Sequence, residues 1–302
     1  MFDIIVIGGG PAGLTAAVYA RRAGKSVLVI EKETFGGQIT FSPKVENIPG
    51  FASISGAAFA EKLTEQAMSQ GAEIECCTAL EIVDGNPKQV VTDEGTFEAH
   101  AVIVATGARH RLLGIPNEED YIGDGISFCA VCDGAFYKGK TVAVVGGGNS
   151  ALQEALLLAE TSEKVVVLQN LANFTGEKAL CDQLAEKKNV EVRFETVVEE
   201  ILDTGAGFAG VRVRNTGTGM AEEIPADGMF VAIGLVPQNE PFRAVLPLNP
   251  YGYADADESC IVETPGIFVA GDCRRKKIRQ VATAASDGAI AALAACDYID
   301  SL

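Results

Sequence analysis

The feature that most constrains the fold is a succession of strand, glycine-rich turn, helix and strand that occurs twice. Both strands are short and apolar, as in buried parallel sheets. The two copies comprise residues 4–7, 8–13, 14–23 and 27–30, and then residues 141–145, 146–151, 152–160 and 165–168. The duplication predicts an α/β protein with two Rossmann-like dinucleotide-binding domains of the three-layer ββα type.

Each glycine of the first turn has its own mechanical role. Gly8 permits the tight turn, Gly10 lets the backbone approach a pyrophosphate, and Gly13 lets the helix pack closely on the strand. The phosphate then lies at the helix N-terminus. The matching positions in the second turn are Gly146, Gly148 and Ala151. One such turn is a weak signal, but two copies in the same context favour dinucleotide binding.

The two copies differ at the acidic residue that binds an adenosine ribose at the end of the second strand. Glu31 holds this position in the first copy, 23 residues beyond Gly8, and predicts an ADP-containing cofactor. Gln169 holds it in the second copy, and the first basic residue after it is Lys178. The second copy therefore predicts a nicotinamide site without the usual determinants for NAD or NADP.

Length and charge narrow the class of protein. The 302 residues suggest about two domains. Acidic residues outnumber basic ones 41 to 24, and a net charge of -17 opposes binding to nucleic acid or an anionic membrane. The uncharged run 4–20 follows Asp3 and is interrupted by glycines, unlike a signal peptide or a membrane span. We expect a cytoplasmic protein with no nucleic-acid partner and no membrane segment.

Two of the eight cysteines, Cys129 and Cys132, form a Cys-x-x-Cys motif. Beside dinucleotide-binding units this spacing is typical of a thiol-disulfide couple, although half a metal site or two buried thiols are alternatives. Zinc would require further ligands, and only His100 and His110 are present, so no metal is expected. The adjacent Asp133 either exchanges protons with the thiols or caps a helix.

Several motifs, in order along nearly the whole chain, resemble the low-molecular-weight bacterial thioredoxin reductases. They occupy residues 8–13, 35–38, 47–51, 105–109, 129–134, 146–151, and 270–272 with 279–281. The resemblance implies a homodimeric flavoprotein. FAD would occupy a discontinuous domain, residues 1–113 and 243–302, and an inserted domain, 114–242, would carry the redox disulfide. We expect the chain to cross between these domains through short paired strands.

The resemblance also assigns cofactor contacts. Gly8, Gly10 and Gly13 would hold the FAD pyrophosphate, and Glu31 the adenosine ribose. Gln38 and Asn47 would line the flavin region, Asp272 would bind the ribityl chain, and the isoalloxazine would be flanked by Arg279, Gln280 and Val281. Further motif positions expected at the cofactor are Pro11, Ala12, Gly37, Thr106, Gly107 and Gly271.

For the dithiol, the resemblance makes Cys132 the partner of the flavin, Cys129 the attacker of thioredoxin, and Asp133 the proton carrier. Phe136 falls where the family offers an aromatic contact to thioredoxin, while Ala135 replaces an aromatic residue found in some members.

The sequence departs from NADPH-using members of the family after the second fingerprint. Those members carry a His-Arg-Arg motif and a further arginine, whereas this chain has Gln169, Asn170, Leu171 and Thr175. In this respect it is similar to the branch that takes electrons from reduced ferredoxin instead of a pyridine nucleotide. The function expected is therefore an FAD-dependent thioredoxin reductase with reduced ferredoxin as its electron donor.

A ferredoxin is usually acidic, so its docking would require local cations. The hypothesis is that exposed members of the basic run Arg274, Arg275, Lys276 and Lys277 contact the donor. A solvated loop explains the run equally well.

Three alternatives to the ferredoxin-dependent reductase stay open. An NADPH- or NADH-dependent reductase with atypical adenosine contacts is compatible with the intact turn 146–151. A flavin-dependent dithiol oxidase would use the same cysteine pair with oxygen as acceptor. A flavin-bound interaction protein would leave Cys129 and Cys132 unexplained.

Overall fold

The computed structural model describes residues 1–42, 44–205 and 207–302, and the chain forms two compact units. Unit 1 comprises Met1–Arg109 and Val236–Leu302, and unit 2 is the inserted segment His110–Leu235. These boundaries lie four and seven residues earlier than the expected domain ends at 113 and 242. They fall there because the chain crosses in both directions through two short strands that pair with each other. These strands are β7 (Ala108–His110) and β16 (Leu235–Pro237).

Unit 1 is built on a seven-stranded sheet in the order β3-β2-β1-β6-β5-β4, with β17 also paired to β6. The strands are β1 (Phe2–Ile7), β2 (Val27–Glu31), β3 (Glu73–Cys76), β4 (Ala79–Val83), β5 (Lys88–Thr92), β6 (Gly95–Val104) and β17 (Ile267–Val269). The ladders joining β3, β2, β1, β6 and β17 are parallel, whereas β4, β5 and the start of β6 form an antiparallel meander.

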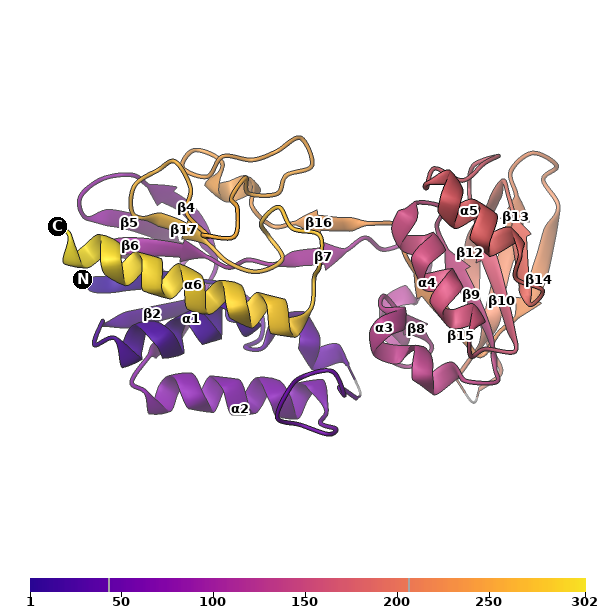
Figure 1. Ribbon diagram of the computed structural model, residues 1–302, viewed down its shortest axis with the longest axis horizontal. Coiled ribbons are helices and arrows are strands. Elements are labelled where there is room, and N and C mark those ends of the chain that lie inside the picture. Colours follow the sequence, from indigo (N-terminus) through magenta and orange to yellow (C-terminus); the bar gives the residue numbers. More distant parts are fainter. Residues whose placement is uncertain (43, 206) are drawn as a thin grey trace. The chain divides into compact units, whose positions relative to one another are not determined.

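The helices of unit 1 cover one face of its parallel strands (Figure 1). They are α1 (Pro11–Arg22), α2 (Gly56–Ser69) and α6 (Val281–Asp300), with short 3-10 turns η1 (Gly37–Phe41) and η4 (Glu240–Phe242). Alternation along β1 explains why both faces are buried. Ile4 and Val6 pack among residues of α1 and α6, while Ile5 and Ile7 pack on the opposite face with the meander.

Unit 2 repeats this layered plan. Its parallel sheet has the order β11-β10-β9-β15-β8, and a three-stranded antiparallel sheet, β12-β13-β14, covers one face. The strands are β8 (Ile126–Ser127), β9 (Thr141–Val145), β10 (Lys164–Leu168), β11 (Val190–Arg193), β12 (Thr196–Asp203), β13 (Phe208–Asn215), β14 (Ala221–Pro225) and β15 (Gly228–Val231).

Helices cover the other face of this parallel sheet. They are α3 (Ala130–Asp133), α4 (Asn149–Ala159) and α5 (Lys178–Ala185), with 3-10 turns η2 (Glu118–Tyr121) and η3 (Gly134–Tyr137). The predicted α/β fold with two Rossmann-like units of helix, parallel sheet and antiparallel sheet is thus confirmed. In both units the glycine-rich turn stands at the carboxyl end of a central strand, where nucleotides bind in this fold.

Candidate active site

The first glycine-rich turn has the geometry that its sequence predicts. Gly8 has a φ of +112°, and a Cβ there would lie 2.3 Å from the carbonyl oxygen of Ala105. A Cβ on Gly13 would lie 1.9 Å from the carbonyl oxygen of Gly8, so α1 can approach β1 only without a side chain at this position. Gly10, by contrast, has no atom closer than 4.0 Å to its Cβ position. Its backbone is therefore accessible to a ligand at the start of α1, which begins at Pro11.

Glu31 ends β2 beside this turn. Its Oε2 accepts a hydrogen bond of 2.7 Å from the backbone N–H of Gly9, and its Oε1 accepts one from Glu33. Burial raises the pKa of the Glu31 carboxyl, and the hydrogen bond from Gly9 partly offsets this effect. The structure thus brings the acidic residue and the turn together, as an adenosine-binding site requires.

Asp272 follows Gly271 shortly after β17, and its partly buried carboxyl has one buried oxygen, Oδ1, that is unsatisfied. Within the described residues Oδ1 has no hydrogen-bond partner, and burial raises the pKa of the group. Lys276 Nζ is 3.8 Å from this oxygen. An unsatisfied buried acceptor is costly and indicates a missing donor, and a hydroxyl of a cofactor side chain fits this requirement.

The segment after Asp272 carries the remaining predicted cofactor residues. Arg279 stacks on the ring of Tyr253 at 4.3 Å and donates to the backbone oxygen of Asp272. Gln280 caps α6 through a reciprocal capping box with Thr283, so Val281 is the first helical residue. Asn47 donates a hydrogen bond of 3.1 Å to the Gln280 side chain, which connects two motifs separated by 233 residues.

Other predicted positions also lie in unit 1. The Gln38 amide donates to the backbone oxygen of Ala108. Gly37 has a φ of +64°, and its Cβ position lies 3.3 Å from the Cα of Gly10. The remaining predicted members occupy these places: Ala12 is buried in α1, Thr106 donates to Asn239, and Gly107 has open space around its Cβ position.

A buried ion cluster behind the turn 271–272 was not foreseen from the sequence. Arg274 is 2% exposed and forms hydrogen bonds of 2.8 Å from Nε and Nη2 to the two carboxyl oxygens of Asp287. Lys276 Nζ donates to the same carboxylate at 2.9 Å, and the backbone N–H of Gly271 donates to it at 3.0 Å. Burial opposes ionisation of Asp287, but the hydrogen bonds from Arg274 and Lys276 outweigh it and lower the pKa.

This cluster corrects the docking hypothesis for the basic run. Arg274 and Lys276 are turned inward and neutralise a buried carboxylate, so neither can contact a partner protein. Arg275 and Lys277 are exposed, and Arg275 pairs with the surface residue Asp255 at 2.7 Å. Alternation of inward and outward side chains in an extended segment explains the difference. A signal in the sequence was Asp287, an acidic residue inside an otherwise Ala-rich helix.

In unit 2, Cys129 and Cys132 form a disulfide with a Cα–Cα distance of 5.3 Å. Cys129 is the N-cap of α3, and the backbone N–H of Cys132 points to the Cys129 sulfur at 3.2 Å. Val131 between the two cysteines is 64% exposed. The pair therefore lies beside an exposed position at the start of α3, and both cysteines are partly exposed.

Asp133 is held beside the disulfide by Ser127, a residue that the sequence did not single out. Ser127 donates a hydrogen bond of 2.6 Å to Asp133 Oδ2 and accepts one of 3.1 Å from the backbone N–H of Cys129. Asp133 Oδ1 is buried without a hydrogen-bond partner, and burial raises the pKa of the carboxyl. A carboxyl with a raised pKa next to a disulfide binds protons more readily than an exposed carboxyl and can exchange them with the cysteines.

The second glycine-rich turn has the backbone geometry of the first but a different neighbour. Gly146 has a φ of +136°. The buried amide of Gln169 covers Gly147, where a Cβ would lie 2.3 Å from the amide nitrogen. That nitrogen donates to the backbone oxygen of Asn173 at 3.0 Å, and the N–H of Thr175 donates to the Gly147 oxygen at 2.9 Å. Groups of the protein itself therefore occupy the hydrogen-bonding atoms of Gln169 and Gly147 next to this turn.

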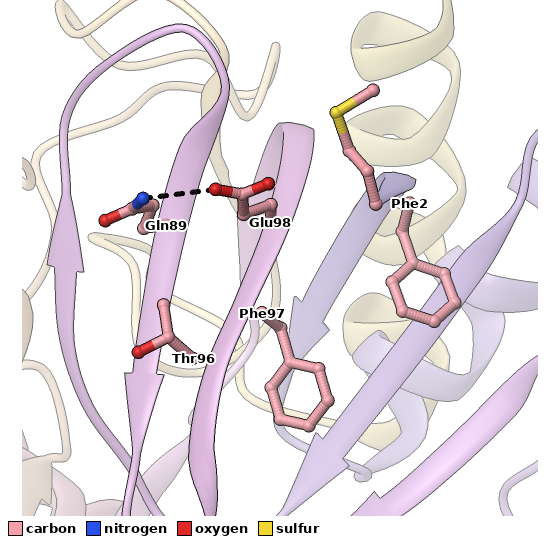
Figure 2. Close-up of a pocket in the computed structure, with 6 residues that line it drawn as sticks. Phe2, Gln89, Thr96, Phe97 and Glu98 are labelled. Carbon is pink, nitrogen blue, oxygen red and sulfur yellow. Dashed lines mark hydrogen bonds between the residues drawn. The ribbon is translucent and has the colours of Figure 1, made fainter.

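A pocket of about 450 Å³ lies away from these sites, at the amino ends of strands in unit 1 (Figure 2). Phe2 begins β1, at the opposite end from the glycine-rich turn, and Phe97 lies on β6. Gln89 donates a hydrogen bond of 3.2 Å to Glu98 across the pocket rim. The pocket contains none of the predicted site residues.

Metal-binding clusters and membrane-spanning helices are both absent from the part of the chain that the structure describes. The described residues contain no cluster of three or more His, Cys, Asp or Glu side chains able to hold a metal ion. Among the same residues, no helix has the length and apolar character needed to cross a membrane.

Comparison with known proteins identifies the family. The model of the pyridine nucleotide-disulphide oxidoreductase family matches residues 2–288. A thioredoxin reductase of Listeria innocua is 39% identical over 100% of this chain and 95% of its own length. The chain belongs to the low-molecular-weight thioredoxin reductase family. The crystal structure of thioredoxin reductase from Streptococcus pyogenes superimposes with a TM-score of 0.94 at 37% identity, covering 100% of this chain and 99% of that one.

A further relative is the "34.2 kDa protein in rubredoxin operon" of Clostridium pasteurianum, which is 41% identical over 98% of this chain and 97% of its own length. Thioredoxin reductases of this family bind FAD. The open backbone at Gly10, the ribose-side carboxyl of Glu31 and the unsatisfied Asp272 Oδ1 all fit this cofactor. The structure therefore agrees with FAD as the cofactor of unit 1.

Proposed function

We propose that this flavoprotein reduces thioredoxin through Cys129 and Cys132, and that reduced ferredoxin rather than NADPH supplies the electrons. The observation that carries the donor assignment is the buried Gln169 amide over Gly147, where NADPH-using relatives are expected to begin their cationic motif. Bound FAD would accept single electrons in succession and deliver a pair to the disulfide. Homodimeric assembly is part of the same proposal.

The cofactor contacts follow from unit 1. Gly8, Gly10 and Gly13 would admit the FAD pyrophosphate at the start of α1, and Glu31 would accept hydrogen bonds from the adenosine ribose. Asp272 supplies an acceptor for the ribityl chain. The flavin region is lined by Gln38, Asn47, Arg279, Gln280 and Val281. The buried cluster of Arg274, Lys276 and Asp287 holds the turn 271–272 in place.

The dithiol chemistry follows from α3. Reduction breaks the Cys129–Cys132 bond and gives two thiols. Cys129 then attacks the thioredoxin disulfide as a thiolate, forming a mixed disulfide and releasing one thioredoxin thiol. Cys132 attacks the mixed disulfide, re-forms the bond to Cys129 and releases the second thiol. Asp133, held by Ser127, carries protons from the attacking to the leaving sulfur.

The lack of cations beside the second glycine-rich turn supports ferredoxin rather than NADPH as the electron donor. Asn170, Leu171 and Thr175 are exposed and uncharged, so no guanidinium is available from these positions for a 2′-phosphate. Lys178, the first cation after them, pairs with Asp182. A charge-assisted hydrogen bond contributes roughly 1.5 to 3 kcal/mol, so loss of two or three would weaken NADPH binding by several decades.

The test is anaerobic bleaching of the flavin by NADPH, NADH and reduced ferredoxin in turn. We expect ferredoxin alone to bleach it rapidly and to support thioredoxin reduction. Stoichiometric bleaching by NADPH would refute the donor assignment. Cys129→Ser should keep its flavin and lose thioredoxin reduction, and unchanged turnover in this variant would refute the thiol mechanism. Sedimentation of the holoenzyme tests the dimer.

A further inference from the structure

The side chain of Asn239, just after β16, is fully buried and forms hydrogen bonds with three segments of unit 1. Thr106 Oγ1 donates a hydrogen bond of 3.0 Å to Asn239 Oδ1. Asn239 Nδ2 donates bonds of 2.9 Å to the carbonyl of Gly252 and of 2.7 Å to the carbonyl of Cys273. Since both acceptors of the nitrogen are carbonyls, the orientation of the amide is fixed. One buried amide thus joins three parts of the chain that are distant in sequence.

Two of these segments carry residues expected at the flavin. Thr106 precedes Gly107, whose Cβ position has open space around it. Cys273 follows Asp272, whose Oδ1 is buried and has no hydrogen-bond partner within the described residues. The Asn239 bond to the Cys273 carbonyl therefore anchors the backbone one residue beyond the carboxyl that is expected at the ribityl chain.

The third segment, which contains Gly252, is joined by its backbone to the segment after Asp272. The N–H of Ala254 donates a hydrogen bond of 2.9 Å to the Cys273 carbonyl. This carbonyl therefore accepts hydrogen bonds from both Ala254 and Asn239. Because the Asn239 nitrogen also binds the carbonyl of Gly252, it holds the two segments side by side.

The Gly252 segment also carries Tyr253, on whose ring the guanidinium of Arg279 stacks at 4.3 Å. Arg279 Nε donates a hydrogen bond of 3.3 Å to the backbone oxygen of Asp272. Arg279 is expected beside the isoalloxazine and Asp272 at the ribityl chain. Both residues are therefore held by backbone that the Asn239 amide joins together.

The backbone of Asn239 is itself anchored. Asn239 is the N-cap of η4, and its carbonyl accepts a hydrogen bond of 2.9 Å from the N–H of Phe242, a core residue that is 2% exposed. The N–H of the preceding Gln238 donates to the carbonyl of Gly107 at 3.3 Å. A side chain on a fixed backbone can impose its position on the groups that it binds.

The adenosine half of the expected cofactor site is held by other hydrogen bonds. Glu31 accepts one of 2.7 Å from the N–H of Gly9, and the N–H of Gly8 donates one of 2.8 Å to the carbonyl of Ile30. The three side-chain hydrogen bonds of Asn239 end elsewhere, on Thr106, Gly252 and Cys273. A change at Asn239 should therefore alter the flavin half of the site and spare the adenosine half.

We infer that Asn239 is a positioning residue for the flavin half of FAD. Its buried amide holds the three segments described above in one arrangement, so the flavin meets a site that is already ordered. Asn239 acts through Asp272 and Arg279, and the inference rests on the FAD contacts proposed for these two residues.

The test compares FAD with ADP, which lacks the flavin half. Asn239→Asp keeps the size of the side chain but replaces the donor nitrogen with an oxygen that faces two carbonyls. For the full-length protein freed of flavin, fluorescence titration should show FAD binding weakened about thirtyfold, because two buried hydrogen bonds are lost. ADP binding, measured by calorimetry as the part that excess FAD displaces, should change less than about twofold, because the glycine-rich turn and Glu31 are intact. Equal losses for FAD and ADP would show a general structural role and overturn the inference, as would unchanged FAD binding.

Asn249→Asp is the matched control, with the same chemical change in the same unit. Asn249 Oδ1 accepts hydrogen bonds of 2.9 Å from the N–H of Tyr251 and 3.1 Å from the N–H of Tyr253, and a carboxylate can accept both. This variant should bind FAD and ADP as the wild type does. If it loses as much FAD affinity as Asn239→Asp, added charge rather than the Asn239 amide is responsible, and the inference is overturned.

A second variant covers failure of Asn239→Asp to fold. Asn239→Ser adds no charge and retains one hydroxyl donor, so it should weaken FAD binding about tenfold and leave ADP binding unchanged. Equal effects on the two ligands, or none on FAD, would overturn the inference in this variant too.

These measurements separate the two proposals, because they require neither an electron donor nor thioredoxin. If the wild type fails to reduce thioredoxin but the variants lose FAD affinity and keep ADP affinity, the proposed function fails and the role of Asn239 stands. If thioredoxin is reduced but FAD and ADP affinities change equally or not at all, the role of Asn239 fails alone.

Discussion

Arg274 and Arg275 are neighbours in the sequence with opposite physical roles. Arg274 is buried against Asp287, whereas the side chain of Arg275 is 61% exposed and pairs with Asp255 at the surface. Removing Arg274 would leave the buried Asp287 carboxylate with only Lys276 and the backbone N–H of Gly271 as partners in a poorly hydrated site. An exposed pair is well solvated, and its loss changes little. The two arginines therefore form a matched comparison.

We predict that Arg274→Met lowers the free energy of unfolding by about 3 kcal/mol, because Asp287 keeps its burial but loses two hydrogen bonds. Arg275→Met should change it by less than about 1 kcal/mol. Urea denaturation followed by circular dichroism and by flavin fluorescence measures both. Equal stabilities of the two variants would contradict the assigned roles.

His110 supplies a pH-dependent contribution to stability. It stacks on Phe128 with ring centroids 4.5 Å apart, and burial lowers its pKa to about 4. In the unfolded chain the imidazole binds a proton below about pH 6.5, whereas the folded protein does not until about pH 4. Folding therefore becomes less favourable as the pH falls through this window.

We predict that His110→Gln, which cannot titrate, reduces the loss of unfolding free energy between pH 6.5 and pH 4 by about 2 to 3 kcal/mol. Denaturation curves at several pH values measure this. An unchanged slope in His110→Gln would show that its burial has no such effect.

At the scale of elements, the two copies of the nucleotide-binding unit have diverged at one contact. In the first, Glu31 accepts a hydrogen bond from the backbone N–H of Gly9, and its carboxylate can also accept hydrogen bonds from a ribose. In the second, Gln169 lies over Gly147 and bonds to its own following loop. The loop 170–175 is exposed and carries no cation. The second copy keeps the backbone turn that could bind a nucleotide, but it lacks the charged side chains that would recognise the adenosine part.

This divergence predicts a gain of function. Asn170→Arg, Leu171→Arg and Thr175→Arg together should strengthen NADPH binding by about one to two decades, since each arginine can pair with the 2′-phosphate. NADH affinity should change much less. NADPH and NADH binding are measured by calorimetric titration, or by titration followed through bleaching of the flavin absorbance.

The control for this gain places three arginines at Thr216, Thr218 and Met220, exposed positions elsewhere in unit 2. It matches the charge change without altering the loop near Gly147. If both triple variants bind NADPH equally, net charge rather than the second site is responsible, and our interpretation of residues 169–175 is wrong.

At the scale of the whole molecule, the net charge of -17 matters less than the location of the cations. Many basic residues are already paired, including Arg274 and Lys276 in the interior. Arg275 and Lys277 remain at the surface of the segment that follows Asp272. An acidic electron donor would be repelled by most of the surface and attracted locally by exposed cations such as these two.

We predict that Arg275→Gln with Lys277→Gln slows ferredoxin-dependent flavin reduction at low salt by about tenfold and weakens its salt dependence. Dithionite, a small reductant, should reduce the flavin of the variant at the wild-type rate. Stopped-flow absorbance measures both reactions. A ferredoxin rate and salt slope equal to those of the wild type would exclude this segment as the docking site.

Much of the fold could be predicted because its signals are local. Apolar runs, glycine positions and their spacing indicated β1, α1, β9 and α4, and the predicted boundaries agree within a few residues. The boundaries of the two units could not be placed as closely, because they depend on pairing between β7 and β16, which are distant in sequence. The same limitation applied to Ser127, whose hydrogen bonds join β8 to the residues of the dithiol segment.

The amino-acid sequence was enough to predict the duplicated nucleotide-binding fold, the Cys129–Cys132 motif and the absence of cations after the second glycine turn. These depend on residue type and short-range spacing, which the chain carries directly. Long-range packing was needed to show that Arg274 and Lys276 point inward to Asp287 and that Gln169 covers Gly147. The reason is physical: burial sets whether a charge is paired, exposed or protonated, and burial is decided by elements far apart in sequence.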